Sequence, residues 1–215
     1  MKRILLCLVA LCAPLSIHAQ MTVGYVPSAG LLTVSDSFIR ANCSSNCGSG
    51  GALGSNWTLN GTTTVSLDNS TGVRFTDGSD SYQSADWTAN TITLNQFSQV
   101  TLLGTDTMGV VVRETPNNVA YAKCQPPNGG CYLIVVVSGS QAYSSFYSAT
   151  SGTPATVRLE AVGHTYTLKY CQGASCTPAT IGSWTNSGSD LTTGQPGIYG
   201  NYSGTYVTNW SGGGL

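Results

Sequence analysis

The sequence predicts an all-β protein built as a two-sheet antiparallel β-sandwich. Sustained helical spacing of apolar residues is absent, and β-branched and aromatic residues dominate the segments between turns. Turn-forming clusters such as DNSTG, TDGSD, PPNGG and SGTP separate these segments. We therefore expect many short strands joined by tight turns.

Two segments indicate how the strands are buried. In TYTLKYC, residues 165–171, Tyr166, Leu168 and Tyr170 alternate with polar residues, which predicts one buried and one wet face. In YLIVVVSG, residues 132–139, the apolar run is continuous, which predicts a strand covered on both sides near the centre of a sandwich. The strands expected from such patterns are 31–40, 64–68, 72–76, 81–88, 96–103, 108–115, 118–124, 131–138, 143–149, 155–162, 165–171, 178–185, 195–201 and 204–210.

The N-terminal segment has the pattern of a secretory signal peptide. Lys2 and Arg3 precede an apolar run, and small and polar residues follow up to Ala19. We expect cleavage near Ala19, which gives a signal peptide at 1–19 and one β-sandwich domain at 20–215. Later segments are too short in apolar residues to span a membrane. The expected location is secreted, periplasmic or at the cell surface.

Charge and composition exclude two classes of protein. Charged residues make up 8% of the chain, and the formal net charge is −1. No stretch gathers the lysines and arginines that neutralise phosphates, so a nucleic-acid partner is not expected. The 11 tyrosines and 4 tryptophans indicate a folded core rather than a disordered chain.

The cysteines of residues 20–215 fall into three close pairs. These pairs are Cys43 with Cys47, Cys124 with Cys131, and Cys171 with Cys176. Six cysteines permit 15 connectivities, and pairing neighbours is the simplest because each pair flanks a loop-like stretch. An exported chain favours disulfides over a thiolate metal site, and no histidine lies near these cysteines in the sequence.

The segment DSFIRANCSSNCGSGGALGSNWT carries a resemblance to a known family. Without the cysteine-containing loop CSSNCGSG it reads DSFIRANGALGSNWT. This closely resembles the Asp-x-Phe-x-Arg-Ala-(Asn/Asp)-Gly-x-Leu-Gly-x-x-Trp opening of bacterial exported domains with the concanavalin A-like lectin/glucanase fold. The cysteine loop is an insertion relative to that opening.

Later segments extend the resemblance over nearly the whole mature chain. They are NQFSQVTLLG at 95–104, GVVVR at 109–113, TVRLEAVGHTYTLKY at 156–170, SGSDLTTGQPGIYG at 187–200 and VTNWSGGG at 207–214. The resemblance implies a jelly-roll sandwich of the LamG type and a lectin-like function. Its motifs are structural, and they occur in modules with many functions.

Catalytic residues of the family have no matching positions in this chain. Its glycosidases resemble one another in a Glu-x-Asp-x-x-Glu strand, whereas this chain has only Glu114 and Glu160 as glutamates. We interpret both as solvated strand ends that balance Arg113 and Arg158, although a meeting of the two across adjacent strands stays open. His164 lies at an expected turn without a nucleophile motif beside it. The sequence thus favours a protein that is not an enzyme.

No cofactor is expected, and a structural calcium ion is left open. The candidate ligands are Asp77 and Asp80, in a loop-rich segment that also leads to Asp86, and Asp36 near the start of the domain.

Aromatic residues are the candidates for ligand binding, because sugar rings stack on flat aromatic faces. Trp57 and Trp210 lie in the opening and closing motifs of the resemblance, which implies that they belong to the core. The remaining ligand-binding candidates are the aromatic residues Tyr121, Trp87 and Tyr147, together with Arg113. Arg113 on one strand and Tyr121 on the next would place a guanidinium donor beside a stacking surface.

The sequence as a whole predicts a secreted, non-catalytic module that binds a glycan, a polysaccharide or a cell-surface polymer. Two alternatives stay open at this stage. One is a glycoside hydrolase with a rearranged carboxylate pair. The other is a structural envelope or matrix component whose Ser- and Thr-rich faces bind other cell-surface proteins.

Overall fold

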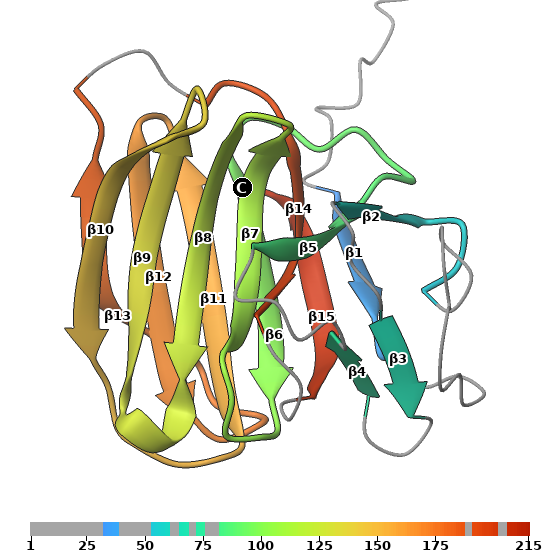
Figure 1. The fold of residues 1–215 in the computed structure, drawn as a ribbon, viewed down its shortest axis with the longest axis vertical. Coiled ribbons are helices and arrows are strands. Elements are labelled where there is room, and N and C mark those ends of the chain that lie inside the picture. The colour runs from blue at the N-terminus through green and yellow to red at the C-terminus, as the bar shows by residue number, and fades with distance from the viewer. Residues whose placement is uncertain are drawn as a thin grey trace, which may run out of the picture. The chain divides into compact units, whose positions relative to one another are not determined.

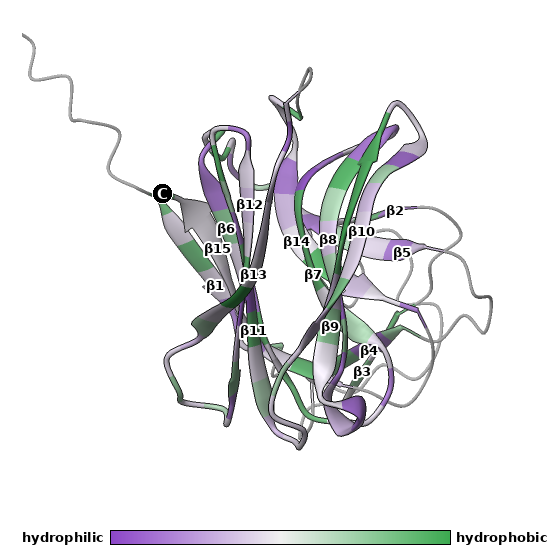
Figure 2. Ribbon diagram, turned by 90° about the vertical axis from the view of Figure 1, so that its left-hand side faces the viewer, coloured by the Kyte–Doolittle hydropathy of each residue, from purple (hydrophilic) through white to green (hydrophobic). Residues whose placement is uncertain are grey.

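Two antiparallel sheets face each other in the computed structural model (Figures 1 and 2). The structure describes residues 32–38, 53–60, 65–68, 72–75, 82–187, 191–201 and 206–215. All of these residues belong to one compact unit, Leu31–Leu215. The predicted all-β, two-sheet antiparallel sandwich is thus confirmed. No helix in the described ranges is long and apolar enough to cross a bilayer.

The first sheet, called sheet A here, has the strand order β13-β12-β11-β6-β15-β4-β3, with β1 paired to β15. Its strands are β1 (Thr33–Asp36), β3 (Val65–Asp68), β4 (Gly72–Phe75), β6 (Gln96–Leu102), β11 (Ala155–Val162), β12 (Thr165–Gln172), β13 (Ala179–Thr185) and β15 (Val207–Gly214). In Figure 2, strands β1, β6, β11, β12, β13 and β15 of this sheet form the layer on the left, and β3 and β4 lie at the lower right.

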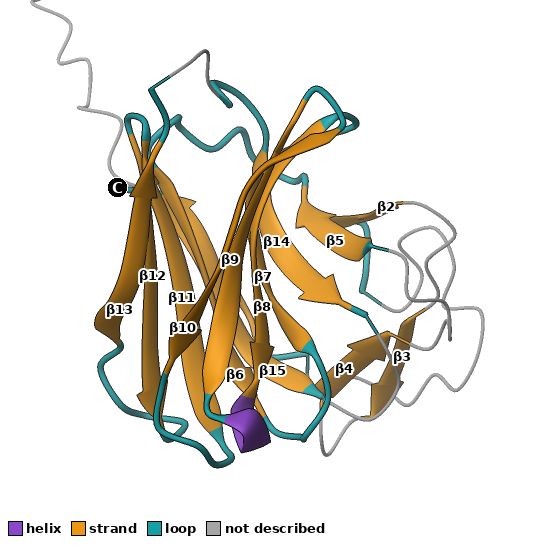
Figure 3. Ribbon diagram, turned by 60° about the vertical axis from the view of Figure 1, so that its left-hand side comes forward, coloured by secondary structure: helices purple, strands orange, loops and turns teal. Residues whose placement is uncertain are grey.

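The second sheet, sheet B, has the strand order β10-β9-β8-β7-β14-β5-β2. Its strands are β2 (Trp57–Asn60), β5 (Gln83–Trp87), β7 (Met108–Thr115), β8 (Asn118–Gln125), β9 (Gly130–Val137), β10 (Ser140–Ser148) and β14 (Gln195–Gly200). A single 3₁₀ turn, η1 (Pro126–Asn128), connects β8 to β9 and is the only helical element among the described residues (Figure 3).

Most of the expected strands agree with the structure, and two differences have clear causes. The sequence pattern misses β2, because its four residues follow a turn and are too few to show an alternation. The expected strand 204–210 ends four residues before β15 does. The glycines after Ser211 have no side chains to reveal a period, yet Gly213 pairs with Thr33 of β1.

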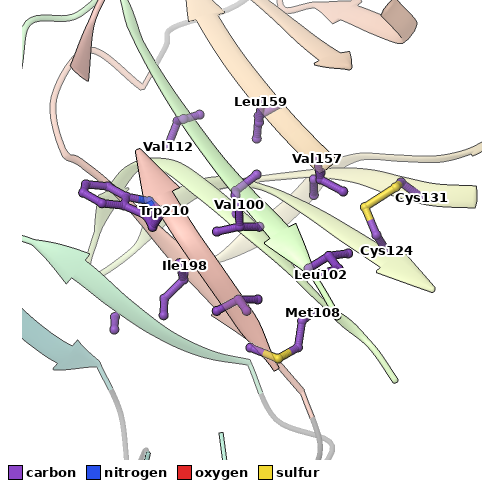
Figure 4. Close-up of a cluster of buried hydrophobic side chains, with 14 of the residues drawn as sticks. Val100, Leu102, Met108, Val112, Cys124, Cys131, Val157, Leu159, Ile198 and Trp210 are labelled. Carbon is purple, nitrogen blue, oxygen red and sulfur yellow. A yellow bond between two sulfur atoms is a disulfide. The ribbon is translucent and has the colours of Figure 1, made fainter. Parts of the chain in front are cut away.

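The core lies between the two sheets and consists of apolar side chains from the inward faces of the strands (Figure 4). Tyr166, Leu168 and Tyr170 of β12 are all buried, as their alternation predicts. The expectation that 132–139 is covered on both sides is wrong. The outer face of β9 is open at Tyr132, which is 39% exposed, because none of the described strands forms a third layer over sheet B.

Three tryptophans pack together at one end of this core. The ring centroids of Trp57 and Trp210 are 4.6 Å apart, and those of Trp87 and Trp210 are 5.4 Å apart. Trp57 and Trp210 are thus core residues, as the resemblance implies. Trp210 Nε1 donates to Ser98 Oγ at 2.9 Å, and Ser98 Oγ donates to the carbonyl of Gly197 at 2.6 Å. Because Gly197 lies on β14, Ser98 connects sheet A to sheet B through a buried hydrogen bond.

Two of the three predicted disulfides are present. Cys124 and Cys131 are directly paired across β8 and β9, and their bridge closes the short connection that contains η1. The bridge between Cys171 and Cys176 closes the turn after β12. The third pair, Cys43 and Cys47, lies outside the described residues. Both observed bridges therefore fasten local turns and not distant parts of the chain.

We expect Ser98→Ala to lower the free energy of unfolding by about 1–3 kcal/mol, because it removes the donor to Gly197 and the acceptor for Trp210 in a buried site. Denaturant unfolding monitored by tryptophan fluorescence measures this change. Ser144→Ala, at an exposed position of β10, serves as the matched control and should change stability little. Equal stabilities of the two variants would contradict the proposed link between the sheets.

Candidate functional site

A cleft of about 690 Å³ opens on the outer face of sheet B, near the ends of β7 and β8. Its walls come from β2, β5, β7, β8 and β9 and from the two turns that join β7 to β8 and β9 to β10. The lining residues are Thr58, Asn60, Tyr82, Asp86, Thr88, Glu114, Thr115, Pro116, Asn117, Asn118, Val119, Tyr121, Val136, Gly139 and Gln195. A volume of this size is typical of small-molecule and cofactor sites.

A β-bulge in β7 decides which side chains of this strand enter the cleft. Val110 and Val112 point into the main core, and Val111 lies on the outer face with Tyr199. Strict alternation would place residue 113 on the outer face as well. However, the pairing register of β7 shifts between Val112 and Thr115, and Arg113 has φ +55°. The extra residue turns Arg113 inward and places Glu114 in the cleft.

Arg113 consequently lies between the sheets and not beside Tyr121. Its guanidinium donates to the carbonyl of Gly163 at 2.7 Å and to that of Leu94 at 2.9 Å, and it lies 5.5 Å from the Tyr166 ring centre. The side chain is 2% exposed. The predicted pair of a guanidinium donor and a stacking tyrosine is therefore not formed, because the bulge reverses the face of Arg113.

Glu114 and Asp86 form a buried pair of carboxyl groups at the base of the cleft. They are 7% and 6% exposed, and their carboxyl groups lie within hydrogen-bonding reach of each other. Ser84 Oγ donates to Glu114 Oε1 at 2.6 Å, and Asn60 Nδ2 donates to Asp86 Oδ2 at 2.7 Å. The interpretation of Glu114 as a solvated strand end is therefore wrong.

Glycine at position 197 leaves the space in which this pair meets. Gly197 lies on β14, between the strands that carry Asp86 and Glu114, and it is paired directly with Asp86. A Cβ atom at this position would lie 2.2 Å from the carbonyl oxygen of Ala85 and 2.8 Å from Asp86 Oδ1. A larger residue here would therefore displace β5 and the carboxyl group that it carries.

The surroundings raise the pKa of both acids. Burial, followed by the charge of Glu114, raises the pKa of Asp86 well above its ordinary value. Burial also raises the pKa of Glu114, although hydrogen bonds from neighbours such as Ser84 oppose the change. Tyr82, whose phenol oxygen lies near both Ser84 and Glu114, has its pKa raised by burial and by the two acids. Burial and proximity therefore both disfavour the doubly ionised form of the pair.

Tyrosines form the apolar wall of the cleft. The ring of half-buried Tyr121 lies 4.8 Å from that of Tyr199 and 5.1 Å from that of Tyr82, measured between centroids. Val119 and Val136 extend the same wall. The cleft thus combines an aromatic surface on β8 with acidic and amide groups on β2, β5 and β7.

The other aromatic candidates lie away from this cleft. Trp87 is buried among the tryptophans at the end of the core and presents no open ring face. Tyr147 is half-buried on β10 at the edge of the sandwich, where its hydroxyl is 2.6 Å from that of Tyr143 and donates to the carbonyl of Ser183. Of the four predicted ligand-binding residues, only Tyr121 lines the cleft.

The predicted metal ligands do not converge in the described part of the chain. Asp36 uses Oδ1 to accept from the Phe38 N–H at 2.8 Å and Oδ2 to accept from Trp57 Nε1 at 2.9 Å. Asp77 and Asp80 lie outside the described residues. Within the described ranges, no group of three or more His, Cys, Asp or Glu residues is placed to hold a metal ion.

Sequence reasoning misses Asn60 and Tyr82 as members of the site, and it groups Asp86 with Asp77 and Asp80 in an acidic segment instead of pairing it with Glu114. A signal for Asp86 is present in QSADW, where Ser84 and Asp86 alternate with the inward-facing Ala85 and Trp87. The contribution of Glu114 depends on the bulge, which no local pattern in GVVVRET reveals. Glu160, by contrast, is balanced by Arg158 and Lys169 as expected for the side chain of a strand in the opposite sheet.

Known proteins are similar to this chain in structure but not in sequence. No family model matches it, and no curated protein sequence is similar to it. The carbohydrate-binding module CBM66 from Bacillus subtilis superposes with a TM-score of 0.56 at 14% identity, over 74% of this chain and 95% of the module. The chain has the concanavalin A-like lectin/glucanase fold. This confirms the fold that the sequence resemblance implies.

Two further structures share this concanavalin A-like fold. Apo Crh5 transglycosylase has a TM-score of 0.59 at 10% identity, and the match covers 85% of this chain and 84% of the transglycosylase chain. Lectin II from Ulex europaeus has a TM-score of 0.51 at 11% identity, and the match covers 86% of this chain and 99% of the lectin chain. Because these identities are low, the similarity establishes the fold and leaves the activity to be argued from the site.

We expect Arg113→Ala to lower the free energy of unfolding by about 2–4 kcal/mol, because two carbonyl groups lose a charged donor in a buried place. Arg158→Ala is the control, because that side chain forms a more exposed ion pair in the same protein, and it should cost about 1 kcal/mol or less. Both values come from denaturant unfolding. An Arg113→Ala variant with normal stability but no ligand binding would contradict this role. It would support the sequence-based expectation that Arg113 and Tyr121 bind a ligand together.

The raised pKa of the acid pair predicts that stability falls as pH rises. A raised folded-state pKa contributes stability below the unfolded-state pKa of about 4, and this contribution is lost as pH rises through the folded pKa. Asn at position 86 cannot ionise. Asp86→Asn should therefore be more stable than the wild type at neutral pH, with a difference that shrinks toward pH 4 in urea titrations.

Glu160→Gln provides a control of opposite sign. Burial raises the pKa of Glu160, but hydrogen bonds from Lys169 and Arg158 outweigh burial and hold this pKa below its ordinary value. The substitution should therefore reduce stability at neutral pH and have little effect in acid. A loss of stability at neutral pH in both variants would rule out a strained acid pair in the cleft.

Proposed function

We propose that the protein is an exported, non-catalytic module that binds a glycan in the cleft on the outer face of sheet B. Export is supported by the signal-peptide pattern of residues 1–19, and the two observed disulfides suit an oxidising environment outside the cytoplasm. The partner is the glycan part of a polysaccharide or of a cell-surface molecule.

The observation that carries this proposal is the combination of groups within one cleft. Tyr121 and the neighbouring valines offer an apolar wall against which the face of a sugar ring can pack. Asn117, Asn118 and Thr115 at the rim provide amide and hydroxyl groups for sugar hydroxyls. A concave apolar surface with a few converging polar groups is the usual form of a small-molecule site.

The geometry of the acid pair disfavours glycoside hydrolysis. Retaining glycosidases hold their two carboxyl groups about 5 Å apart, and inverting enzymes hold them farther apart to admit a water molecule. The carboxyl groups of Asp86 and Glu114 are buried against each other instead of facing an open space between them, as the two acids of a glycosidase do. The carbohydrate-binding module and the lectin among the structural neighbours give further support for binding.

We expect Tyr121→Ala to weaken glycan binding by about 2 kcal/mol, roughly thirtyfold in Kd, because it removes the central aromatic surface of the cleft. A glycan array would identify ligands of the wild type, and calorimetry would then measure the affinity of the variant.

Tyr147→Ala is the matched control, because the same side chain is removed at the sheet edge, outside the cleft. It should keep the affinity of the wild type, and circular dichroism would check that both variants fold. If Tyr147→Ala lost affinity while Tyr121→Ala kept it, the site would lie at the edge between β10 and β13.

A further inference from the structure

The base of the cleft holds acceptor oxygens that lack donors. Asp86 Oδ1 and Glu114 Oε2 are buried and have no hydrogen-bond partner, although the other oxygen of each carboxyl group accepts a bond from Asn60 or Ser84. The phenol oxygen of Tyr82 is also buried without a well-formed hydrogen bond. The two carboxyl groups can satisfy each other only while the pair holds a proton, so the ionised pair needs a donor from a ligand at this place.

No cation of the described residues serves this pair. The residues that line the cleft include no lysine, arginine or histidine. Arg113 is next to Glu114 in the chain, but its guanidinium is bonded to carbonyl groups between the sheets. The titratable groups of the cleft and its tyrosine wall are thus Asp86, Glu114 and the phenols Tyr82, Tyr121 and Tyr199, none of which carries positive charge.

The number and charge of these oxygen atoms indicate which chemical group of a ligand could bind them. A sugar hydroxyl supplies a donor but no charge, so it leaves the two acids competing for one proton. Calcium prefers six to eight oxygen ligands, and the cleft presents one unpartnered oxygen from each of two carboxyls and one phenol. An ammonium group supplies three donors and a positive charge in a compact form, which suits two adjacent carboxylates.

We propose that the cleft selects a glycan unit with a free, protonated amino group, such as a non-acetylated hexosamine, whose ammonium group binds to Asp86 and Glu114. This inference rests on the proposed glycan-binding function. The sugar ring lies against Tyr121, and Tyr82 joins the two parts of the site, because its ring contacts Tyr121 and its hydroxyl lies near Glu114. Acetylation of the amine removes the charge and two donors and adds bulk at the acid pair.

Binding of the ammonium group also displaces a proton from the pair. Without ligand, burial and the proximity of the two acids disfavour the doubly ionised pair and favour a protonated acid. When the ammonium group enters, both acids ionise, and the proton leaves to solvent. Calorimetry in two buffers with different heats of ionisation therefore reports proton release for an amino sugar and none for its acetylated form.

The test uses the exported protein and oligosaccharides in matched trios. Each trio shares a gluco, galacto or manno backbone and differs only in bearing an amino, acetamido or hydroxyl group at carbon 2. At about pH 6, where amines are protonated, we expect the amino form of at least one trio to bind about tenfold or more tightly than its partners. The double variant Asp86→Asn, Glu114→Gln should lose this preference, and Glu160→Gln should keep it.

The outcomes separate this inference from the proposed function. Equal or tighter binding of the acetamido or hydroxyl form overturns the amino-sugar inference and leaves glycan binding intact. Binding of neutral forms that requires calcium and disappears in the double variant also overturns it, in favour of a metal ion at the acid pair. If no form of any trio binds with or without calcium, the proposed glycan-binding function fails as well.

Discussion

The bulge at Arg113 is the constraint on which the functional face of this sandwich depends. It reverses the alternation of β7 after Val112, so that an arginine enters the interior and a glutamate enters the cleft. A left-handed backbone conformation is costly for a residue other than glycine, by about 1–3 kcal/mol, and it persists only where the surroundings enforce it. Arg113 is such a residue, with φ +55°. The groups that hold Arg113 in place therefore also position Glu114.

These groups come from both sheets. Gln96 of β6 accepts from the Arg113 N–H at 3.0 Å, and the guanidinium reaches the carbonyls of Leu94 and Gly163. On the other side, Gly194 has φ +118° and passes so close that a Cβ atom there would lie 2.3 Å from the carbonyl carbon of Arg113. Sheet A thus orients a cleft that lies wholly on sheet B. A change in the turn after β11 or before β6 would act on the cleft through Arg113.

The fold could be predicted from the sequence because its determinants are local and periodic. The alternation in β12 and the close spacing of two cysteine pairs, Cys124 with Cys131 and Cys171 with Cys176, each depend on only a few neighbouring residues, and the structure agrees with them. The site could be predicted only in part. Tyr121 lines the cleft from the outer face of β8, whereas Arg113 does not, because the bulge after Val112 turns it between the sheets, and no local pattern in the sequence reveals that bulge. The meeting of Asp86 with Glu114 depends on Gly197 of an intervening strand, which is far from both in the chain.

The acid pair is costly for the folded protein because both groups are buried next to each other. Two buried carboxyl groups in contact disfavour the ionisation of each other. Two hydrophobic side chains in their place would bury no oxygen atom that needs a hydrogen-bond donor. The surrounding strands nevertheless fix both groups, through Asn60 and Ser84, in a position that opens to the cleft. Local strain of this kind is common where a protein keeps groups prepared for a ligand. Because the fold itself does not require the pair, its energetic cost supports the proposal that the cleft recognises an amino sugar, in which the tyrosine wall would give contact area and the acids would select the ammonium group.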